Sequence, residues 1–337
     1  MILLITLAAL LTAALFYQSL SSYLDSRRLP PLGRLVDTGS CRLHLRELGA
    51  GTPVVILESG IAATSISWAL VQSRVAEFAR VASYDRAGLG WSAPCVAPRT
   101  LQHMLSELNT LLAAAQLPPP YVLVGHSFGG LLIRAYAHLH PAEVVGLVFV
   151  DPVSLSHWSR CTPQEIRRLR TGARLSRRGA LLAHLGVVRA ALALLVAGNR
   201  RLPAFIARAS AGRATGVLSN IVGQIQKLPP VYWPMVRSHW SSPKSFRAMA
   251  AYLECLPASA QAATQMSLPP DLPFVILSAS SATPAELHER DLWTRQSSCG
   301  RHVIIEDTGH WLPFERPDAV IRAIRELVDI ARHRSNS

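Results

Sequence analysis

The chain has 337 residues, the length of one large domain or two small ones, and half of them are hydrophobic, so wholesale disorder is excluded. The formal net charge is +13, from 34 basic and 21 acidic side chains, which favours contact with nucleic acid or with an anionic membrane surface. Because 32 of the basic residues are arginine, a general bias toward arginine is an alternative explanation of the charge.

The chain begins with an apolar segment, Ile2–Phe16, which only two threonines interrupt. This is the length of a long signal-peptide core and is shorter than the roughly 20 residues of a comfortable bilayer span, although residues 2–20 together are long enough for a tilted one. The charged residues Arg27 and Arg28 follow the segment, which by the positive-inside rule keeps the rest of the chain cytoplasmic. We therefore expect a membrane-associated protein with a single N-terminal anchor. The alternatives are a signal that is cleaved on secretion and a helix that docks on the globular fold.

From Arg42 onward, short apolar runs alternate with stretches of helical periodicity, which predicts an α/β fold with a mostly parallel central sheet flanked by helices. Between the fourth and fifth predicted strands the chain is rich in Ala, Leu and Arg, which predicts an inserted helical cap. The predicted strands are Val54–Leu57, Arg80–Tyr84, Tyr121–Val124, Val145–Val150, Phe274–Leu277 and His302–Ile305. The predicted domains are an anchor or signal at 1–21, a linker with two prolines at 22–35, a core at 36–151 and 268–333, and the cap at 152–267.

The cysteines lie far apart and include no C-x-x-C pair, so neither a disulfide framework nor a structural zinc site is predicted. The sequence also contains no H-E-x-x-H motif, no P-loop and no complete dinucleotide fingerprint, so no metal ion or cofactor is expected. The five cysteines are Cys41, Cys95, Cys161, Cys255 and Cys299.

The most informative stretch joins the predicted strand at 121–124 to a helical pattern through the motif G-x-S-x-G, which contains Gly125, Ser127 and Gly129. In such a turn the serine adopts a strained conformation that raises its Oγ above the sheet, and the neighbouring glycines leave room for the tight turn. The backbone N–H of Phe128, at the start of the helix, would then face a developing oxyanion. This context predicts that Ser127 is a catalytic nucleophile.

At these residues the chain resembles the α/β-hydrolase family, and the resemblance covers about residues 34–333. The segment Leu57–Ile61 (LESGI) stands in the place of the family's oxyanion loop. The segment Tyr84–Ser92 (YDRAGLGWS) is similar to the family's D-x-x-G-x-G-x-S loop, and Asp307–His310 (DTGH) is similar to the G-H pair that follows its last strand. The resemblance implies an α/β-hydrolase fold.

The resemblance also implies a second oxyanion donor, the N–H of Ile61. The family usually has His-Gly in this loop, whereas this chain has Ser59-Gly60. The oxyanion hole is therefore expected to consist of the backbone N–H groups of Phe128 and Ile61.

A serine hydroxyl needs a base to remove its proton, and His310, which follows a predicted strand and a glycine turn, is the expected one. The family's acid usually follows the strand before the last, but no carboxylate stands there. Asp151 follows the preceding strand, which resembles the placement of the acid in some haloalkane dehalogenases. We therefore expect Asp151 to orient His310. The alternative acids are Glu286, Glu289 and Asp291.

These residues predict a serine hydrolase that cleaves carboxylic esters, with lipid-like esters as a candidate class. A serine nucleophile argues against epoxide hydrolysis and dehalogenation, which need a carboxylate at this position. Amide hydrolysis, C–C bond hydrolysis, acyl transfer and cofactor-free peroxidation use the same triad and are alternatives, because a fold does not separate them. A non-catalytic binding module on a hydrolase scaffold is an alternative of another class.

The basic residues are concentrated in the predicted cap. Residues 152–267 contain 16 Lys and Arg against two acidic residues, a net charge of +14, whereas the rest of the chain carries −1. A basic cap is suited to anionic lipid head groups or to an acidic substrate. A solvated arginine-rich cap is the alternative, and nucleic acid is not an expected partner.

Overall fold

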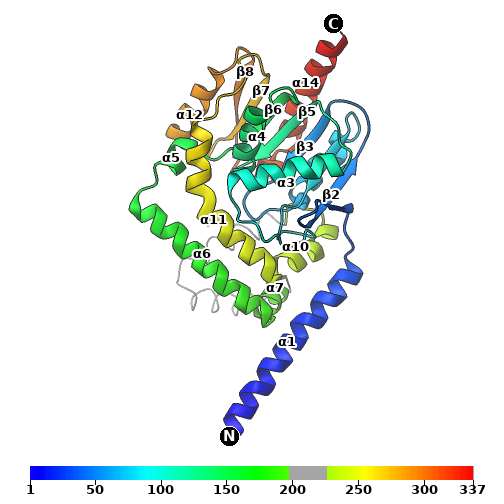
Figure 1. Ribbon diagram of the computed structural model, residues 1–337, viewed down its shortest axis with the longest axis vertical. Coiled ribbons are helices and arrows are strands. Elements are labelled where there is room, and N and C mark those ends of the chain that lie inside the picture. Colours follow the sequence, from blue (N-terminus) through cyan, green and yellow to red (C-terminus); the bar gives the residue numbers. More distant parts are fainter. Residues whose placement is uncertain (197–225, 337) are drawn as a thin grey trace. The chain divides into compact units, whose positions relative to one another are not determined.

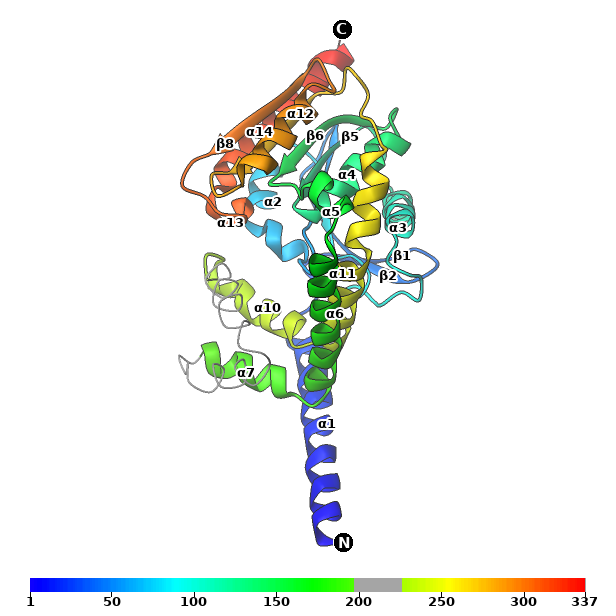
Figure 2. The same ribbon diagram turned by 90° about the vertical axis from the view of Figure 1, so that its left-hand side faces the viewer.

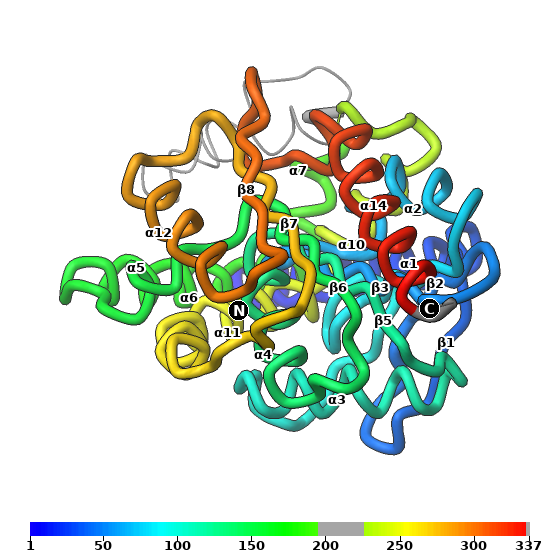
Figure 3. The backbone as a smooth tube through the Cα atoms, turned by 90° about the horizontal axis from the view of Figure 1, so that it is seen from above, coloured from blue at the N-terminus to red at the C-terminus, as the bar shows by residue number. Residues whose placement is uncertain are grey.

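An eight-stranded sheet organises the larger part of the computed structural model, which describes residues 1–196 and 226–336 (Figure 1). The strand order is β1-β2-β4-β3-β5-β6-β7-β8, with β1 and β8 at opposite edges (Figure 3). Strand β2 is antiparallel to both its neighbours, and the other neighbouring strands are parallel. The strands are β1 Arg34–Asp37, β2 Arg42–Leu48, β3 Val54–Glu58, β4 Val81–Tyr84, β5 Tyr121–His126, β6 Val144–Val150, β7 Phe274–Ala279 and β8 Gly300–Ile305.

All six predicted strands are present, which confirms an α/β fold with a mostly parallel sheet. Strands β1 and β2 were not predicted. They form an antiparallel edge hairpin that alternates exposed or polar positions with apolar ones, so they lack the continuous apolar run of a strand that is buried on both faces.

Helices cover both faces of the sheet (Figure 2). Helices α3 (Leu101–Ala114) and α4 (Phe128–Leu139) lie on one face, and α2 (Ala69–Val75) and α14 (Pro317–Asn336) lie on the other. The buried aliphatic side chains of β3, β5, β6 and β7 pack with those of α2 and α14 in one continuous cluster. This core holds the carboxyl ends of the parallel strands in place. The short helices of the same unit are η1 Ser65–Trp68, α5 Leu155–Ser159, α12 Pro284–Thr294 and α13 Leu312–Glu315.

The chain divides into two compact units. One contains residues 32–170 and 251–337, and the other contains residues 1–31 and 171–250. The regular elements in the described part of the predicted cap are helices, and the cap boundaries at 152 and 267 stay a prediction. These helices are α5, α6 Pro163–His184, α7 Val187–Val196, η2 Pro230–Tyr232, α10 Trp233–Trp240 and α11 Pro243–Thr264.

The N-terminal helix α1 spans Ile2–Arg28 and is longer than the sequence analysis predicted. Residues 22–28 of the predicted linker are therefore helical, because the prolines that marked the linker stand only at positions 30 and 31. By length and composition α1 is able to cross a membrane. Its most apolar stretch of 18 residues has a mean hydropathy of 1.9, and 6% of that stretch is buried. Signal sequences meet the same criterion.

Candidate active site

Ser127 lies at a sharp turn between the end of β5 and the start of α4. Its φ of 55° and ψ of −116° are a strained combination for a residue with a side chain, which costs about 1–3 kcal/mol. A Cβ atom at Gly125 would lie 2.5 Å from the carbonyl group of Gly129. One at Gly129 would collide with the carbonyl oxygen of Glu58. The turn therefore depends on both glycines of the G-x-S-x-G motif.

His310 and Asp151 lie together although 159 positions separate them in sequence. Nδ1 of His310 is 2.6 Å from Oδ2 of Asp151, and the His310 ring packs against the ring of His126, with 4.8 Å between the centroids. Because His126 immediately precedes Ser127, this contact brings the His310 ring beside the turn. Within the described part of the chain, Oγ of Ser127 makes no cap hydrogen bond to α4, and the His310 ring is bonded through Nδ1, which leaves Nε2 open.

Asp151 is nearly buried and is held ionised by its neighbours. Its Oδ1 accepts hydrogen bonds from the Arg290 guanidinium at 2.8 Å and from the backbone N–H of Ala279 at 3.1 Å. Burial opposes ionisation, but the hydrogen bond to His310 and the charge of Arg290 outweigh it and hold the pKa of Asp151 below its usual value. Arg290 was not singled out in the sequence analysis, because nothing in its sequence context marks it.

The other carboxylates considered as the acid have different partners. Glu286 accepts hydrogen bonds from the backbone N–H and hydroxyl of Thr283 in the capping box that begins α12. Glu289 binds the N-terminus of α5, and Asp291 is 2.6 Å from Nδ1 of His302. Asp151 is thus the one of the four that contacts His310.

The loop after β3 lies directly against Ser127. A Cβ atom at Gly60 would be 3.4 Å from Cβ of Ser127 and 3.3 Å from Nδ1 of His126. The expected oxyanion donors belong to these two neighbouring segments: Ile61 follows Gly60, and Phe128 is the first residue of α4, where a backbone N–H has no acceptor inside the helix. The two N–H groups are therefore on segments that meet at Ser127.

A buried ion pair shapes this loop. Glu58, the last residue of β3, lies 2.7 Å from the Arg86 guanidinium, and both are fully buried. Tyr84 donates a hydrogen bond to Glu58, and Arg86 donates to the carbonyl oxygens of Ser59 and Gly60. Burial raises the pKa of Glu58, and the charge of Arg86 opposes that rise. Glu58 and Arg86 stand in two of the motifs that carry the resemblance, 57–61 and 84–92, but neither residue was assigned a role from the sequence.

His126 connects the turn at Ser127 to the loop that carries His310. Its Nε2 donates to the backbone carbonyl of His310 at 2.7 Å, and its Nδ1 is buried without a hydrogen-bond partner in the described residues. Burial, reinforced by the proximity of His310, lowers the pKa of His126 to about 3. The ring is therefore neutral in the folded protein at ordinary pH.

This buried neutral histidine predicts acid sensitivity. Because an unfolded histidine binds a proton below about pH 6.5, while folded His126 does so only near pH 3, stability should fall with decreasing pH through that window by about 1.4 kcal/mol per pH unit. Denaturant unfolding at several pH values should show a smaller slope for His126→Gln, whose amide can still donate to His310. Exposed His288→Gln is the control, and an unchanged slope in His126→Gln would contradict the prediction.

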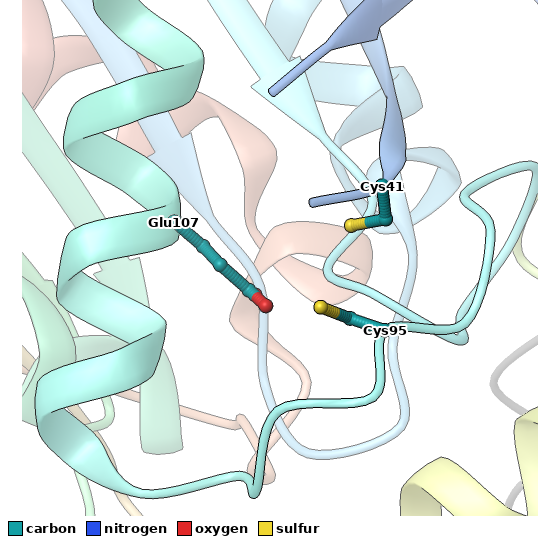
Figure 4. A group of neighbouring side chains, drawn as sticks. All are labelled: Cys41, Cys95 and Glu107. Atoms are coloured by element: carbon teal, nitrogen blue, oxygen red, sulfur yellow. The ribbon is translucent and has the colours of Figure 1, made fainter. Parts of the chain in front are cut away.

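One group of potential metal ligands was found among the described residues (Figure 4). The ligand atoms of Cys41, Cys95 and Glu107 lie within 4.8 Å of one another. However, both carboxylate oxygens of Glu107 accept hydrogen bonds from Arg99, at 2.6 and 2.8 Å. A cation would have to displace this guanidinium, so we assign no metal to the group.

The family model described as Alpha/beta hydrolase family matches residues 54–323, which include Ser127, Asp151 and His310. A solved esterase from Thermogutta terrifontis shares the fold, with a TM-score of 0.58 and 23% identity over 85% of this chain and 92% of that one.

Two curated proteins are similar over shorter segments. The protein named Probable transporter efuK, from Hormonema carpetanum, is 38% identical over 125 residues, which are 35% of this chain and 18% of that protein. The 2-hydroxy-6-oxo-2,4-heptadienoate hydrolase of Pseudomonas putida is 33% identical over 128 residues, which are 37% of this chain and 46% of that enzyme. This chain therefore spans less than half the length of these relatives.

Proposed function

Because this chain belongs to the alpha/beta hydrolase family, we propose that it is a serine hydrolase that cleaves carboxylic esters through an acyl-Ser127 intermediate. The observation that carries the proposal is the position of the Asp151–His310 pair beside the strained turn that presents Ser127. Such a pair can activate a serine, because the carboxylate fixes the histidine proton on Nδ1 and leaves Nε2 to act as a base.

In the proposed reaction, Nε2 of His310 accepts the proton of Ser127 as Oγ attacks the ester carbonyl. The resulting imidazolium is stabilised by Asp151 and gives this proton to the leaving alkoxide, so that an alcohol departs and the acyl group stays on Ser127. Water then attacks the acyl group and gives a proton to His310, which returns it to Ser127 as the acid leaves.

The negative charge that forms on the carbonyl oxygen would be stabilised by the N–H groups of Phe128 and Ile61. The Glu58–Arg86 ion pair supports this assignment indirectly, because Arg86 binds the carbonyl groups of the two residues that precede Ile61. It thereby restrains the loop on which the second donor depends.

We also propose that the protein is membrane-associated through residues 2–20 and that lipid-like esters are among its substrates. The length and hydropathy of α1 support the first part. The charge of the cap supports the second, although four of its arginines, at positions 200, 201, 208 and 213, lie outside the described residues. Helix α6 alone exposes six arginines: Arg167, Arg168, Arg170, Arg174, Arg177 and Arg178.

A fluorophosphonate probe tests whether the chain is a serine hydrolase or a binding module on the same scaffold. We expect the full chain to be labelled covalently at Ser127, because an activated serine attacks the phosphorus atom and forms a stable adduct. Digestion and mass spectrometry locate the label. Heat-denatured protein is the control, and an unlabelled native protein would contradict the proposed function.

C–C bond hydrolysis is the second candidate, because the Pseudomonas putida relative is named as a hydrolase of a 2-hydroxy-6-oxo dienoate. Rates on a panel of p-nitrophenyl esters of increasing acyl length should be compared with rates on such a dienoate, with and without anionic vesicles. Higher kcat/KM on the esters supports the proposed function, and the reverse order favours the second candidate.

A further inference from the structure

The burial pattern of α1 is the reverse of that expected for a helix in water. Its one buried residue is polar Gln18, which is 4% exposed. The large apolar side chains of Ile2–Phe16 are between 43% and 81% exposed. Two parts of α1 thus have different surroundings: an uncovered apolar part, and a polar part that packs on other residues of its own compact unit.

The polar part is bound by Arg189 of α7, a residue that is 6% exposed. The Arg189 guanidinium pairs with Asp25 and donates hydrogen bonds to Gln18 at 3.2 Å and to Ser22 at 3.5 Å. Gln18, Ser22 and Asp25 are spaced four and three residues apart, so they share one face of α1. Gln18 also donates to the carbonyl group of Ser241, which follows α10, at 3.3 Å. One face of α1 is therefore fixed to two cap helices.

Close packing accompanies these polar contacts. Gly186, between α6 and α7, has a φ of 70°, and a Cβ atom there would lie 2.6 Å from the ring of Tyr17. Because Gly186 has no side chain, the Tyr17 ring has room to pack against this turn. The contacts of Tyr17 and Gln18 begin immediately after the apolar segment ends at Phe16.

We propose that α1 is a permanent stem of the cap, with residues 17–25 docked on α7 and α10 and residues 2–16 inserted in a lipid bilayer. Removal of α1 as a signal would leave the charge of Arg189 buried without Asp25, and a buried charge without a partner is strongly destabilising. This inference deepens the membrane association proposed above and does not depend on the chemistry at Ser127.

The position of the docking contacts places the cap at the lipid surface. Residues 2–16 lie in the hydrocarbon region in this proposal, and docking begins at Tyr17 and Gln18, so the cap has to lie in the interface. Leu181 and Leu182, which are 64% and 39% exposed and precede the turn at Gly186, are the side chains that we expect to meet the head groups.

The state of the N-terminus provides the first test. The full chain is expressed, and the membranes of the expressing cells are washed with alkaline carbonate. The intact mass of the protein extracted from them is then measured. We expect a carbonate-resistant protein of the full 36.6 kDa. A soluble protein whose chain starts between residues 17 and 32 would overturn both the stem and the anchor.

Asp25→Asn tests the docking itself, in the full chain in detergent. The unpaired Arg189 should lower the Tm by about 5 °C or more and should increase trypsin cleavage after Arg27 or Arg28 about tenfold. Removing the cation as well, in Asp25→Asn/Arg189→Met, should recover at least half of both changes. The control is Asp329→Asn, the same change at an exposed helical position, which should behave as the wild type.

The two experiments separate the docked stem from the membrane anchor of the proposed function. A retained, membrane-bound helix together with a wild-type Tm and trypsin rate in Asp25→Asn would overturn the stem and leave the anchor standing. A double variant that is no more stable than Asp25→Asn would also overturn it, because the cost would then not come from the unpaired Arg189.

Discussion

Ser127→Ala is expected to lower kcat for ester hydrolysis by about five to six orders of magnitude, the largest effect that we predict for any single residue. The variant keeps the backbone and the Cβ atom of the turn, but it has no hydroxyl to attack the substrate and form the acyl intermediate. Single-turnover measurements with a p-nitrophenyl ester should therefore show no burst of product. Since alanine at φ 55° is as strained as serine, the Tm should change little.

Ser281→Ala is the matched control, because this serine is exposed on the loop after β7. It is held there through its backbone N–H, which donates to the carbonyl oxygen of Thr308, and the substitution leaves that bond in place. It should retain wild-type turnover. If Ser127→Ala retains turnover within tenfold of the wild type, another group is the nucleophile and the proposed function is wrong.

Asp151→Asn should lower kcat by about three to four orders of magnitude with little change in KM. The asparagine side chain would keep its oxygen toward Arg290 and Ala279, because both donate hydrogen bonds to Oδ1 of the native aspartate. Its NH2 group would then face Nδ1 of His310, and that nitrogen would have to accept a hydrogen bond from it. The histidine proton would move to Nε2, the atom that has to accept the proton of Ser127.

The control for Asp151→Asn is Asp291→Asn, which makes the same chemical change in the carboxylate that binds His302. Circular dichroism should show that both variants are folded. Near-normal kcat in Asp151→Asn would contradict the assignment. Low kcat in Glu286→Gln, Glu289→Gln or Asp291→Asn would contradict it equally, because none of these carboxylates contacts His310.

The elements that the sequence predicted best are those whose pattern is local. Five of the six predicted strands are apolar runs that are almost wholly buried, whereas β8, which was also predicted as a buried strand, lies at the edge of the sheet and is partly exposed. The glycines around Ser127 reveal a tight turn without reference to any distant residue. The hairpin of β1 and β2 was missed because β2 alternates polar with apolar residues and β1 is only four residues long, so neither strand has a continuous apolar run. The linker was placed too early because the helical pattern of α1 continues through polar residues up to Arg28.

Buried polar pairs were the hardest features to predict. Glu58 and Arg86, which restrain the loop after β3, are adjacent only because β3 and β4 pair in parallel. Arg189 and Asp25 are 164 positions apart, and each has the sequence context of an ordinary surface residue. The identity of a partner across such a distance depends on the packing of whole elements.

By itself, the sequence determined the α/β character of the chain, the turn at Ser127 and the candidates for the base and the acid, because periodicity and turn chemistry are properties of neighbouring residues. Only the tertiary structure decided which carboxylate lies within hydrogen-bond distance of His310. The parallel order β6-β7-β8 brings the carboxyl ends of three strands to one edge of the sheet, with Asp151 following β6 and His310 following β8. The carboxylates of α12, although closer to His310 in sequence, are directed by their own helix to other partners.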